Sequence, residues 1–139
     1  MNETERILEM LGGRKHAART VAVVGLSDDP SKASYTVSAY MQAQGYRILP
    51  VNPGIASVLG ERSYASLRDL PELPDVVNVF RLPKAIPAIV DEMLALGLRD
   101  LWVQLGIRNE AAAQTAEAGG IHVVMNRCIM VEHRRLLRD

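Results

Sequence analysis

The sequence predicts an α/β fold in which a doubly wound sheet of about five parallel strands carries helices on both faces. The run TVAVV at residues 20–24 is β-branched and apolar throughout, which is typical of a strand buried on both faces. Similar runs recur along the chain and alternate with stretches that have apolar residues at helical spacing. The connections are short. Because parallel crossovers are right-handed, such a chain closes into one Rossmann-like domain over residues 1–139.

The chain opens with a short predicted helix over about residues 2–12, followed by the first strand. Asn2 is a candidate N-cap with Glu5 three residues on, and Gly12 and Gly13 end the helix. The strand at residues 20–24 stops at Gly25. This order places a polar loop directly after the first buried strand.

Four more strands alternate with helices after Gly25. Ser34 is a candidate cap for the next helix, Asn109 caps an alanine-rich one, and Pro50 places the end of the second strand close to Leu49. Residues 52–74 are expected to be mostly turns, with a short helical turn around 66–70. The strands are expected at residues 46–51, 76–80, 101–105 and 121–125, and the helices at 34–44, 83–96, 109–118 and 127–137.

Composition excludes several classes of protein. Lys and Arg number 16, as do Asp and Glu, and this balance argues against a dedicated nucleic-acid binder. The single cysteine, Cys128, excludes an internal disulfide framework. No N-terminal segment combines a basic start, an apolar core and a small-residue cleavage site, so we expect no secretory leader, and no apolar run approaches the roughly 20 residues that a membrane span needs. We expect a soluble, cytoplasmic domain that neither binds nucleic acid nor enters a membrane.

Cationic and hydroxyl side chains gather in the loops that follow the predicted strands. In open α/β sheets, ligands bind outside the carboxyl ends of the strands. The helix N-terminus near Ser34 adds free N–H groups, and Tyr35 or Phe80 can pack against a flat ring. Asp28 and Asp29 count against phosphates close to their part of the loop. The candidate phosphate and purine contacts are Ser27, Ser31, Lys32, Ser34, Arg81, Lys84, Arg108 and Arg127.

The first loop does not match the common nucleotide motifs. A dinucleotide fingerprint has three glycines, but only Gly25 is present, and Ser27 stands where the second would be. The second strand ends at Asn52 and Pro53, with no carboxylate for a ribose diol. NAD is therefore disfavoured, and no Walker loop is present.

Five short motifs occur in order at the strand ends. They are Gly25-x-Ser27-x-x-Pro30-x-Lys32-x-Ser34-Tyr35, Val51-Asn52-Pro53, Phe80-Arg81-x-Pro83, Gln104-Leu105-Gly106 and Asn126-Arg127-Cys128-x-x-x-Glu132-His133. In these motifs the chain resembles the small bacterial CoA-binding domain proteins, a family similar to the nucleotide-binding domain of the succinyl-CoA synthetase α subunit. The motifs run from Val21 to about Leu136, which is nearly the whole chain.

The resemblance implies that coenzyme A lies across the carboxyl ends of the strands. Its phosphates would face the loop at residues 25–34, with Lys32 as the main cationic partner, and the pantetheine would lie toward Gln104. The family often has Arg where this chain has Lys32, which keeps the charge but loses bidentate geometry. The residues that the resemblance assigns to the site are Gly25, Ser27, Pro30, Lys32, Ser34, Tyr35, Val51, Asn52, Pro53, Phe80, Arg81, Pro83, Gln104, Gly106, Ile107, Arg127 and Cys128.

The sequence does not establish a reaction, and it favours a binding module that senses, stores or presents CoA or an acyl-CoA. Cys128 and His133 stand five residues apart, which on a helix turns them about 140° from each other. Cys128 is interpreted as structural, a mixed disulfide with the CoA thiol being a second hypothesis. Neither a metal-binding spacing nor a catalytic triad is readable. The alternatives are an NAD(P)-dependent redox enzyme and an acyl-CoA enzyme that needs a partner.

The sequence names no protein partner. Ala112, Ala113 and Ala116 share one helix and allow close packing, inside the monomer as readily as between subunits. A homo-oligomer therefore remains an open expectation.

Overall fold

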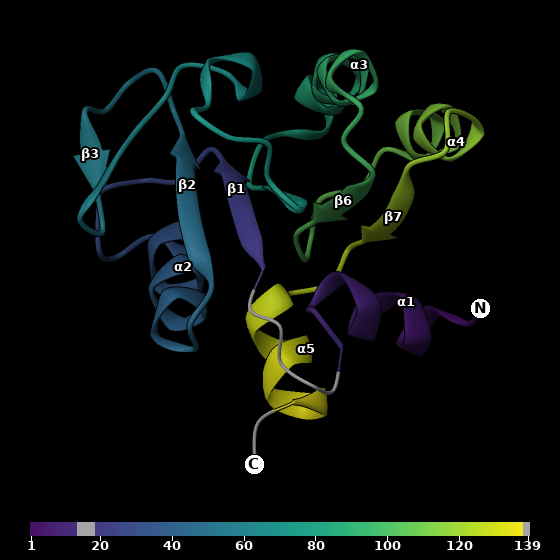
Figure 1. Cartoon of the computed structure of the whole chain (residues 1–139), viewed down its shortest axis with the longest axis horizontal. Coiled ribbons are helices and arrows are strands. Elements are labelled where there is room, and N and C mark those ends of the chain that lie inside the picture. The colour runs from purple at the N-terminus through teal and green to yellow at the C-terminus, as the bar shows by residue number, and fades with distance from the viewer. Residues whose placement is uncertain (14–18, 138–139) are drawn as a thin grey trace.

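A parallel sheet of five strands runs through the centre of the molecule (Figure 1). The computed structural model describes residues 1–13 and 19–137. The strands lie in the order β2-β1-β5-β6-β7 and all their pairings are parallel. Their bounds are β1 Thr20–Val24, β2 Arg47–Val51, β5 Val76–Val79, β6 Asp100–Val103 and β7 His122–Met125. The predicted α/β fold is confirmed. Because the chain order reverses beside β1, the junction of β1 and β5 is the topological switch point.

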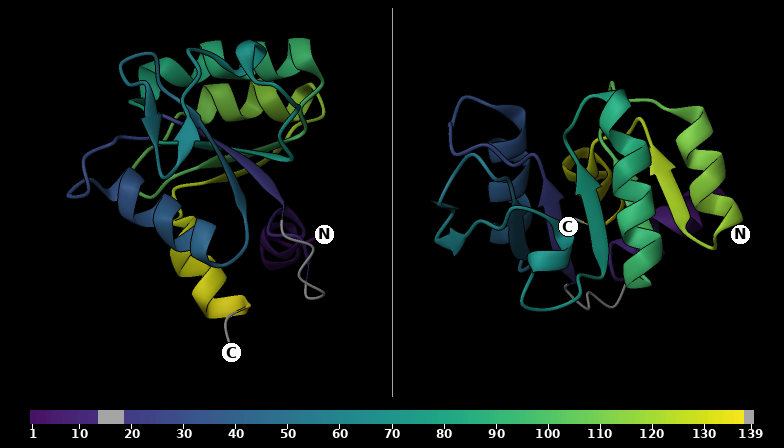
Figure 2. Two further views of the ribbon diagram at one scale, coloured as in Figure 1. Left: turned by 60° about the vertical axis from the view of Figure 1, so that its left-hand side comes forward. Right: turned by 90° about the horizontal axis from the view of Figure 1, so that it is seen from above.

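Two layers of helices cover the sheet (Figures 1 and 2). On one face lie α3 (Ile86–Leu96) and α4 (Glu110–Ala118), and on the other α1 (Glu3–Met10), α2 (Ala33–Ala43) and α5 (Ile129–Leu136). None of the helices in these described ranges is both long and apolar enough to cross a bilayer. All five strands are thus sandwiched, as the continuous apolar runs predict.

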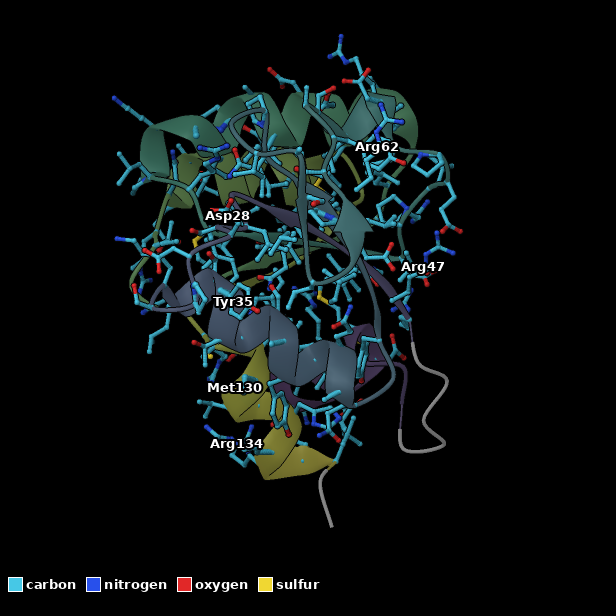
Figure 3. The ribbon with its side chains drawn as sticks, turned by 90° about the vertical axis from the view of Figure 1, so that its left-hand side faces the viewer. Asp28, Tyr35, Arg47, Arg62, Met130 and Arg134 are labelled. Atoms are coloured by element: carbon cyan, nitrogen blue, oxygen red, sulfur yellow. The ribbon has the colours of Figure 1, made fainter. Side chains whose placement is uncertain are left out.

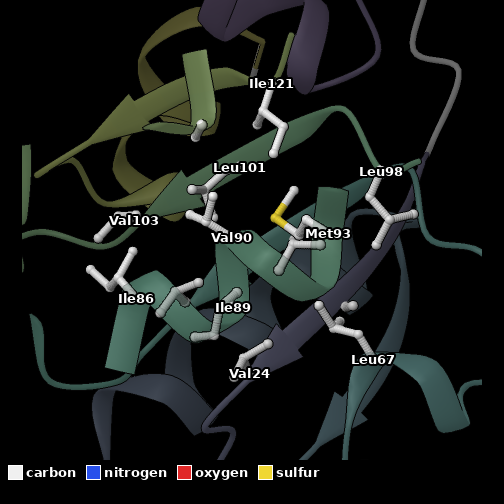
Figure 4. Close-up of a cluster of buried hydrophobic side chains, with 14 of the residues drawn as sticks. Val24, Leu67, Ile86, Ile89, Val90, Met93, Leu98, Leu101, Val103 and Ile121 are labelled. Atoms are coloured by element: carbon white, nitrogen blue, oxygen red, sulfur yellow. The ribbon is translucent and has the colours of Figure 1, made fainter. Parts of the chain in front are cut away.

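Each face of the sheet has its own hydrophobic core. On the α3 side, Ile86, Val90 and Met93 pack with Leu101 and the other buried strand residues shown in Figure 4. On the α2 side, the fully buried Trp102 lies among the inner residues of α1, α2 and α5. Ala112, Ala113 and Ala116 of α4 are also buried, so that their close packing is used inside the monomer.

The predicted caps of two helices are confirmed and that of a third is wrong. The Asn2 side chain accepts a hydrogen bond from the N–H of Glu5 at 2.9 Å, and that of Asn109 accepts one from Ala112 at 3.0 Å. Helix α2, however, begins one residue before Ser34, with Lys32 at the N-cap position. The Ser34 hydroxyl lies inside the first turn and bonds the preceding loop instead.

Several other boundaries differ from the sequence prediction. Strand β6 ends at Val103 rather than at 105, and α3 begins at Ile86 after a 3-10 turn at Pro83–Ala85. Strand β2 continues through Pro50 to Val51, because β2 is an edge strand of this sheet and tolerates the missing N–H. Helix α5 begins at Ile129 rather than near residue 127. The stretch predicted as turns contains the hairpin β3 (Ser57–Val58) and β4 (Glu61–Arg62), while the 3-10 turn at Leu67–Asp69 is as expected.

Arg19 fastens the amino edge of the sheet. Its guanidinium donates to the carbonyl of Glu9 at the end of α1 and to the carboxylate of Asp100 at the start of β6, both at 2.9 Å. His122 approaches the same carboxylate at 3.2 Å. A hollow of about 680 Å³ lies here. Gly13 and Arg19, which end the described ranges on either side of the gap, both line this hollow, and Arg19, Asp100 and His122 bind one another, so that the hollow supplies no argument for a ligand.

Candidate functional site

The candidate site lies at the opposite edge, where the five parallel strands end. All five predicted loops meet there, because parallel strands point their carboxyl ends the same way. The three that adjoin the switch point are residues 25–32 after β1, 52–54 after β2 and 80–82 after β5. The loops at residues 104–109 and 126–128 follow β6 and β7.

Gly25 is the point at which the first three loops touch. Its φ is +92°, and its N–H donates to the carbonyl of Val51 at 2.9 Å. A Cβ at Gly25 would lie only 2.6 Å from the carbonyl oxygen of Phe80 and 3.3 Å from Cδ of Arg81. A side chain does not fit here. The missing Cβ lets the β1 and β5 ends approach each other and lets the Arg81 stem lie over the turn.

The serines of the first loop mainly hold the loop itself. The Ser34 hydroxyl accepts from the N–H of Ser27, and the Ser27 hydroxyl accepts from that of Asp29, both at 3.0 Å. The Asp29 carboxylate then accepts from both the N–H and the hydroxyl of Ser31. These bonds from Ser31 lower the pKa of Asp29, and nearby Lys32 lowers it further. The loop is therefore pre-shaped, with its carboxylate ionised and engaged.

The N-terminus of α2 follows directly. Lys32 occupies the N-cap position with an exposed side chain that makes no cap hydrogen bond. The main-chain N–H groups of Ala33 and Ser34 have no acceptor in the described part of the chain, as is usual in a first helical turn. The half-buried ring of Tyr35 lies on the same turn of α2 (Figure 3). Donors and a flat ring thus stand side by side at the positive end of the helix.

The cations of this edge fall into two groups. Lys32, Arg81 and Lys84 form no ion pair within residues 1–13 and 19–137, since no carboxylate oxygen lies within 4.0 Å of them. Arg108 instead binds Glu110 at 2.6 Å, and Arg127 binds Glu3 of α1. The unpaired charges follow β1 and β5, while those beside β6 and β7 are neutralised.

Asn52 connects the second loop to the first. Its side-chain N–H donates to the carbonyl of Leu26 at 2.9 Å, and its side-chain oxygen accepts from Gly54 at 2.8 Å. Val51 is buried and Pro53 is exposed. Asn52 therefore positions the two loops, and its neighbour Pro53 is the residue of this loop whose side chain is exposed at the edge.

The β6 side of the edge is built from main chain and amides. The buried Gln104 accepts the N–H of Ile129 at 3.0 Å and so holds the start of α5. The N–H of Gly106, a residue with φ +87°, donates to the side chain of Asn126 at 2.7 Å. Sequence reasoning assigns Asn126 no role of its own. An asparagine directly after a strand was the available signal, since its φ of 62° is one that asparagine tolerates well.

Two further predicted residues lie farther from the switch point. Pro83 is exposed, and its carbonyl accepts from the Asn109 side chain at 3.0 Å. Ile107 is half-buried against the α3-side core. Pro83 and Ile107 therefore stabilise the loops around the candidate site and do not lie at the β1–β5 junction itself.

Cys128 and His133 are not placed as a catalytic pair. Cys128 occupies the N-cap position of α5, half-buried against the α2-side core. His133 is fully buried farther along α5, where its Nδ1 lies 2.9 Å from the Tyr40 hydroxyl. Glu132, a buried carboxylate on the same helix, binds Arg135 at 2.7 Å. The side chains that could take part in a reaction are thus engaged in structural contacts: Cys128 with the core, His133 with Tyr40 and Glu132 with Arg135.

Comparison with known proteins decides the family. The family model described as "CoA binding domain" matches residues 19–134, which include every strand and each of the five loops. The chain belongs to this CoA-binding domain family.

The relatives of this CoA-binding domain include small proteins of the same size. The uncharacterized protein YneT of Bacillus subtilis is 41% identical over 116 residues, which cover 84% of this chain and 86% of YneT. A solved structure from Thermus thermophilus, cell-free ID.343, is 41% identical and matches with a TM-score of 0.89 over 99% of this chain and 100% of its own.

A larger relative of the domain is an enzyme. The ADP-forming acetate–CoA ligase II of Archaeoglobus fulgidus is 26% identical over 83 residues, covering 58% of this chain. This stretch makes up only 12% of the ligase.

Proposed function

We propose that this chain is a binding module that holds coenzyme A, or a CoA thioester, across the carboxyl edge at the β1–β5 junction. One observation carries the proposal. Arg81 lies against the Gly25 turn and Lys32 at the start of α2 beside its open N–H groups, and both cations are without ion pairs in the described part of the chain. A pyrophosphate and a 3′-phosphate need this combination of charge and main-chain donors.

The shape of the edge supports the same ligand. The half-buried rings of Tyr35 and Phe80 offer flat surfaces for an adenine next to the cations. The end of β2 carries Asn52, whose amide is already bonded to Leu26 and Gly54, where NAD-binding folds place a carboxylate for the ribose diol. These features favour a ligand with a phosphorylated ribose over NAD.

Calorimetry with matched ligands and variants tests the proposal. CoA, dephospho-CoA, NAD and NADP are titrated into the wild type, Lys32→Met and Arg81→Met. Methionine keeps an aliphatic stem over Gly25 and removes the charge. We expect CoA to bind most tightly and each variant to weaken it by about 10- to 100-fold, since a hydrogen bond to a charged group contributes about 1.5–3 kcal/mol.

Arg99→Met is the matched control. Arg99 is an exposed arginine that also has no ion pair in the described ranges, but it lies at the amino edge, just before β6. Its substitution leaves CoA affinity unchanged under the proposal. Equal losses of CoA affinity in all three variants would mean that only the net charge of the protein matters. Binding of NAD but not of CoA would favour the NAD(P)-dependent redox enzyme instead.

A further inference from the structure

Two leucines at the carboxyl edge are left in solvent. Leu82 follows β5 and Leu105 follows β6, and they are 67% and 65% exposed. Burying a leucine side chain stabilises a fold, so that exposing one at each of two neighbouring strand ends forgoes that stabilisation. Residues 1–13 and 19–137 supply no cover for either side chain.

The two leucines belong to loops that are bonded to each other. The Asn109 side chain donates to the carbonyl of Pro83, the residue after Leu82, at 3.0 Å. The N–H of Gln104, the residue before Leu105, donates to the carbonyl of Val79 at 3.2 Å. We call Leu82 and Leu105 together the leucine ledge.

The ledge adjoins the proposed CoA site through Leu82, which lies between Arg81 and Lys84, two cations that form no ion pair in the described ranges. Beyond the ledge, Arg108 and Arg127 are neutralised by Glu110 and Glu3. The edge therefore changes from cationic at β1 and β5 to apolar and neutral at β6.

A CoA thioester has the same polarity along its length. Its nucleotide end is highly charged, and its pantetheine arm is uncharged and ends in the acyl group. Two strand spacings, about 10 Å, separate β1 from β6, a span that an extended pantetheine arm exceeds. The path passes Gly106, where a Cβ would have no atom within 4 Å, so that the main chain there is open to a ligand.

We propose that the leucine ledge seats the apolar acyl group of a CoA thioester, and that the preferred ligand is therefore an acyl-CoA rather than free CoA. This inference rests on the proposed function and names the ligand class of the same site. Each methylene that the ledge removes from water strengthens binding by up to about fourfold, and by about twofold where one side stays wet.

An acyl-chain series tests the inference. Dissociation constants are measured for CoA and for acetyl-, butyryl-, hexanoyl- and octanoyl-CoA with the wild type, Leu82→Ser, Leu105→Ser and Leu73→Ser. Leu73 is the matched control because it is 63% exposed but precedes β5 at the amino edge. We expect affinity to rise with chain length in the wild type and Leu73→Ser, and to become flat in both ledge variants while free CoA still binds.

The outcomes separate this inference from the proposed function. If the wild type does not bind CoA at all, both fail. If CoA binds but its affinity is the same along the acyl series, only the leucine ledge is overturned. A flat series together with a dimer that Leu82→Ser and Leu105→Ser dissociate in sedimentation would assign the ledge to a second copy of the chain and refute the acyl seat.

Discussion

Replacing Gly25 by alanine is the sharpest test of how the site is built. The new Cβ would stand 2.6 Å from the carbonyl oxygen of Phe80 and 3.3 Å from Cδ of Arg81. The first contact is with main chain and cannot be relieved by a rotamer change. The β1 and β5 loops must therefore move apart, which carries the Arg81 side chain away from the turn.

The expected loss of stability has two parts. A non-glycine residue at φ +92° costs about 1–2 kcal/mol. Overpacking against a fixed carbonyl adds about 1–3 kcal/mol. The sum, about 2–5 kcal/mol, is below the stability of most domains of this size, so that the Gly25→Ala protein should still fold.

Gly60→Ala measures the first part alone, so that its difference from Gly25→Ala gives the second. Gly60 has φ +78° in the β3–β4 turn, and a Cβ there would have no atom within 4 Å. Urea unfolding should show a loss of about 1–2 kcal/mol for Gly60→Ala and a larger one for Gly25→Ala. CoA titration should show lost affinity for Gly25→Ala alone. Equal unfolding free energies and unchanged CoA affinity in the two variants would refute the close-approach reasoning.

Three further substitutions test individual contacts. Burial raises the pKa of the Tyr46 hydroxyl to about 12, whereas the unfolded value is about 10. The folded state thus holds this proton more tightly, and the unfolding free energy should fall by up to about 3 kcal/mol as the pH rises from roughly 10 to 12. The Tyr46→Phe variant should not show this fall. An identical fall in the wild type and the variant would contradict the assignment to Tyr46. Asn52→Asp replaces the donor to Leu26 by an acceptor and should cost about 1–3 kcal/mol in urea unfolding, an unchanged midpoint counting against the link. Trp102→Phe loses the 2.8 Å bond to the Arg127 carbonyl as well as core volume, and should cost about 2–4 kcal/mol by the same assay; a loss below 1 kcal/mol would show that the core closes around the smaller ring.

The fold was readable from the sequence because its strong signals are local. The run at residues 20–24 is a strand in the structure, and Asn2 and Asn109 cap the helices expected of them. The end of β2 was predicted too early, close to Leu49 before Pro50, because the sequence does not reveal that β2 is an edge strand. The β3–β4 hairpin was not predicted from the sequence, because its turn uses Leu59 at φ 55°, a conformation that leucine rarely adopts.

The site was readable as a set of loops but not as a set of roles. Parallel strand order alone brings Lys32 and Arg81 to one edge. What no spacing rule shows is that the hydroxyls of Ser27 and Ser34 shape the loop, or that Glu3 of a distant helix neutralises Arg127. These roles depend on tertiary contacts. The ligand contacts themselves remain predictions.

The pairing of β1 with β5 has a kinetic consequence. Val21 and Val76, the first partners in this pairing, are 55 positions apart in the chain. Closing a loop of that length costs roughly 3.5 kcal/mol of entropy beyond a constant, so that non-local strand pairs of this kind form slowly. The contact of Gly25 with Phe80 lies just beyond the end of this pairing and does not exist before it closes. A ligand that needs this contact acts only after the barrier, and it therefore lengthens the lifetime of the folded chain without hastening its formation.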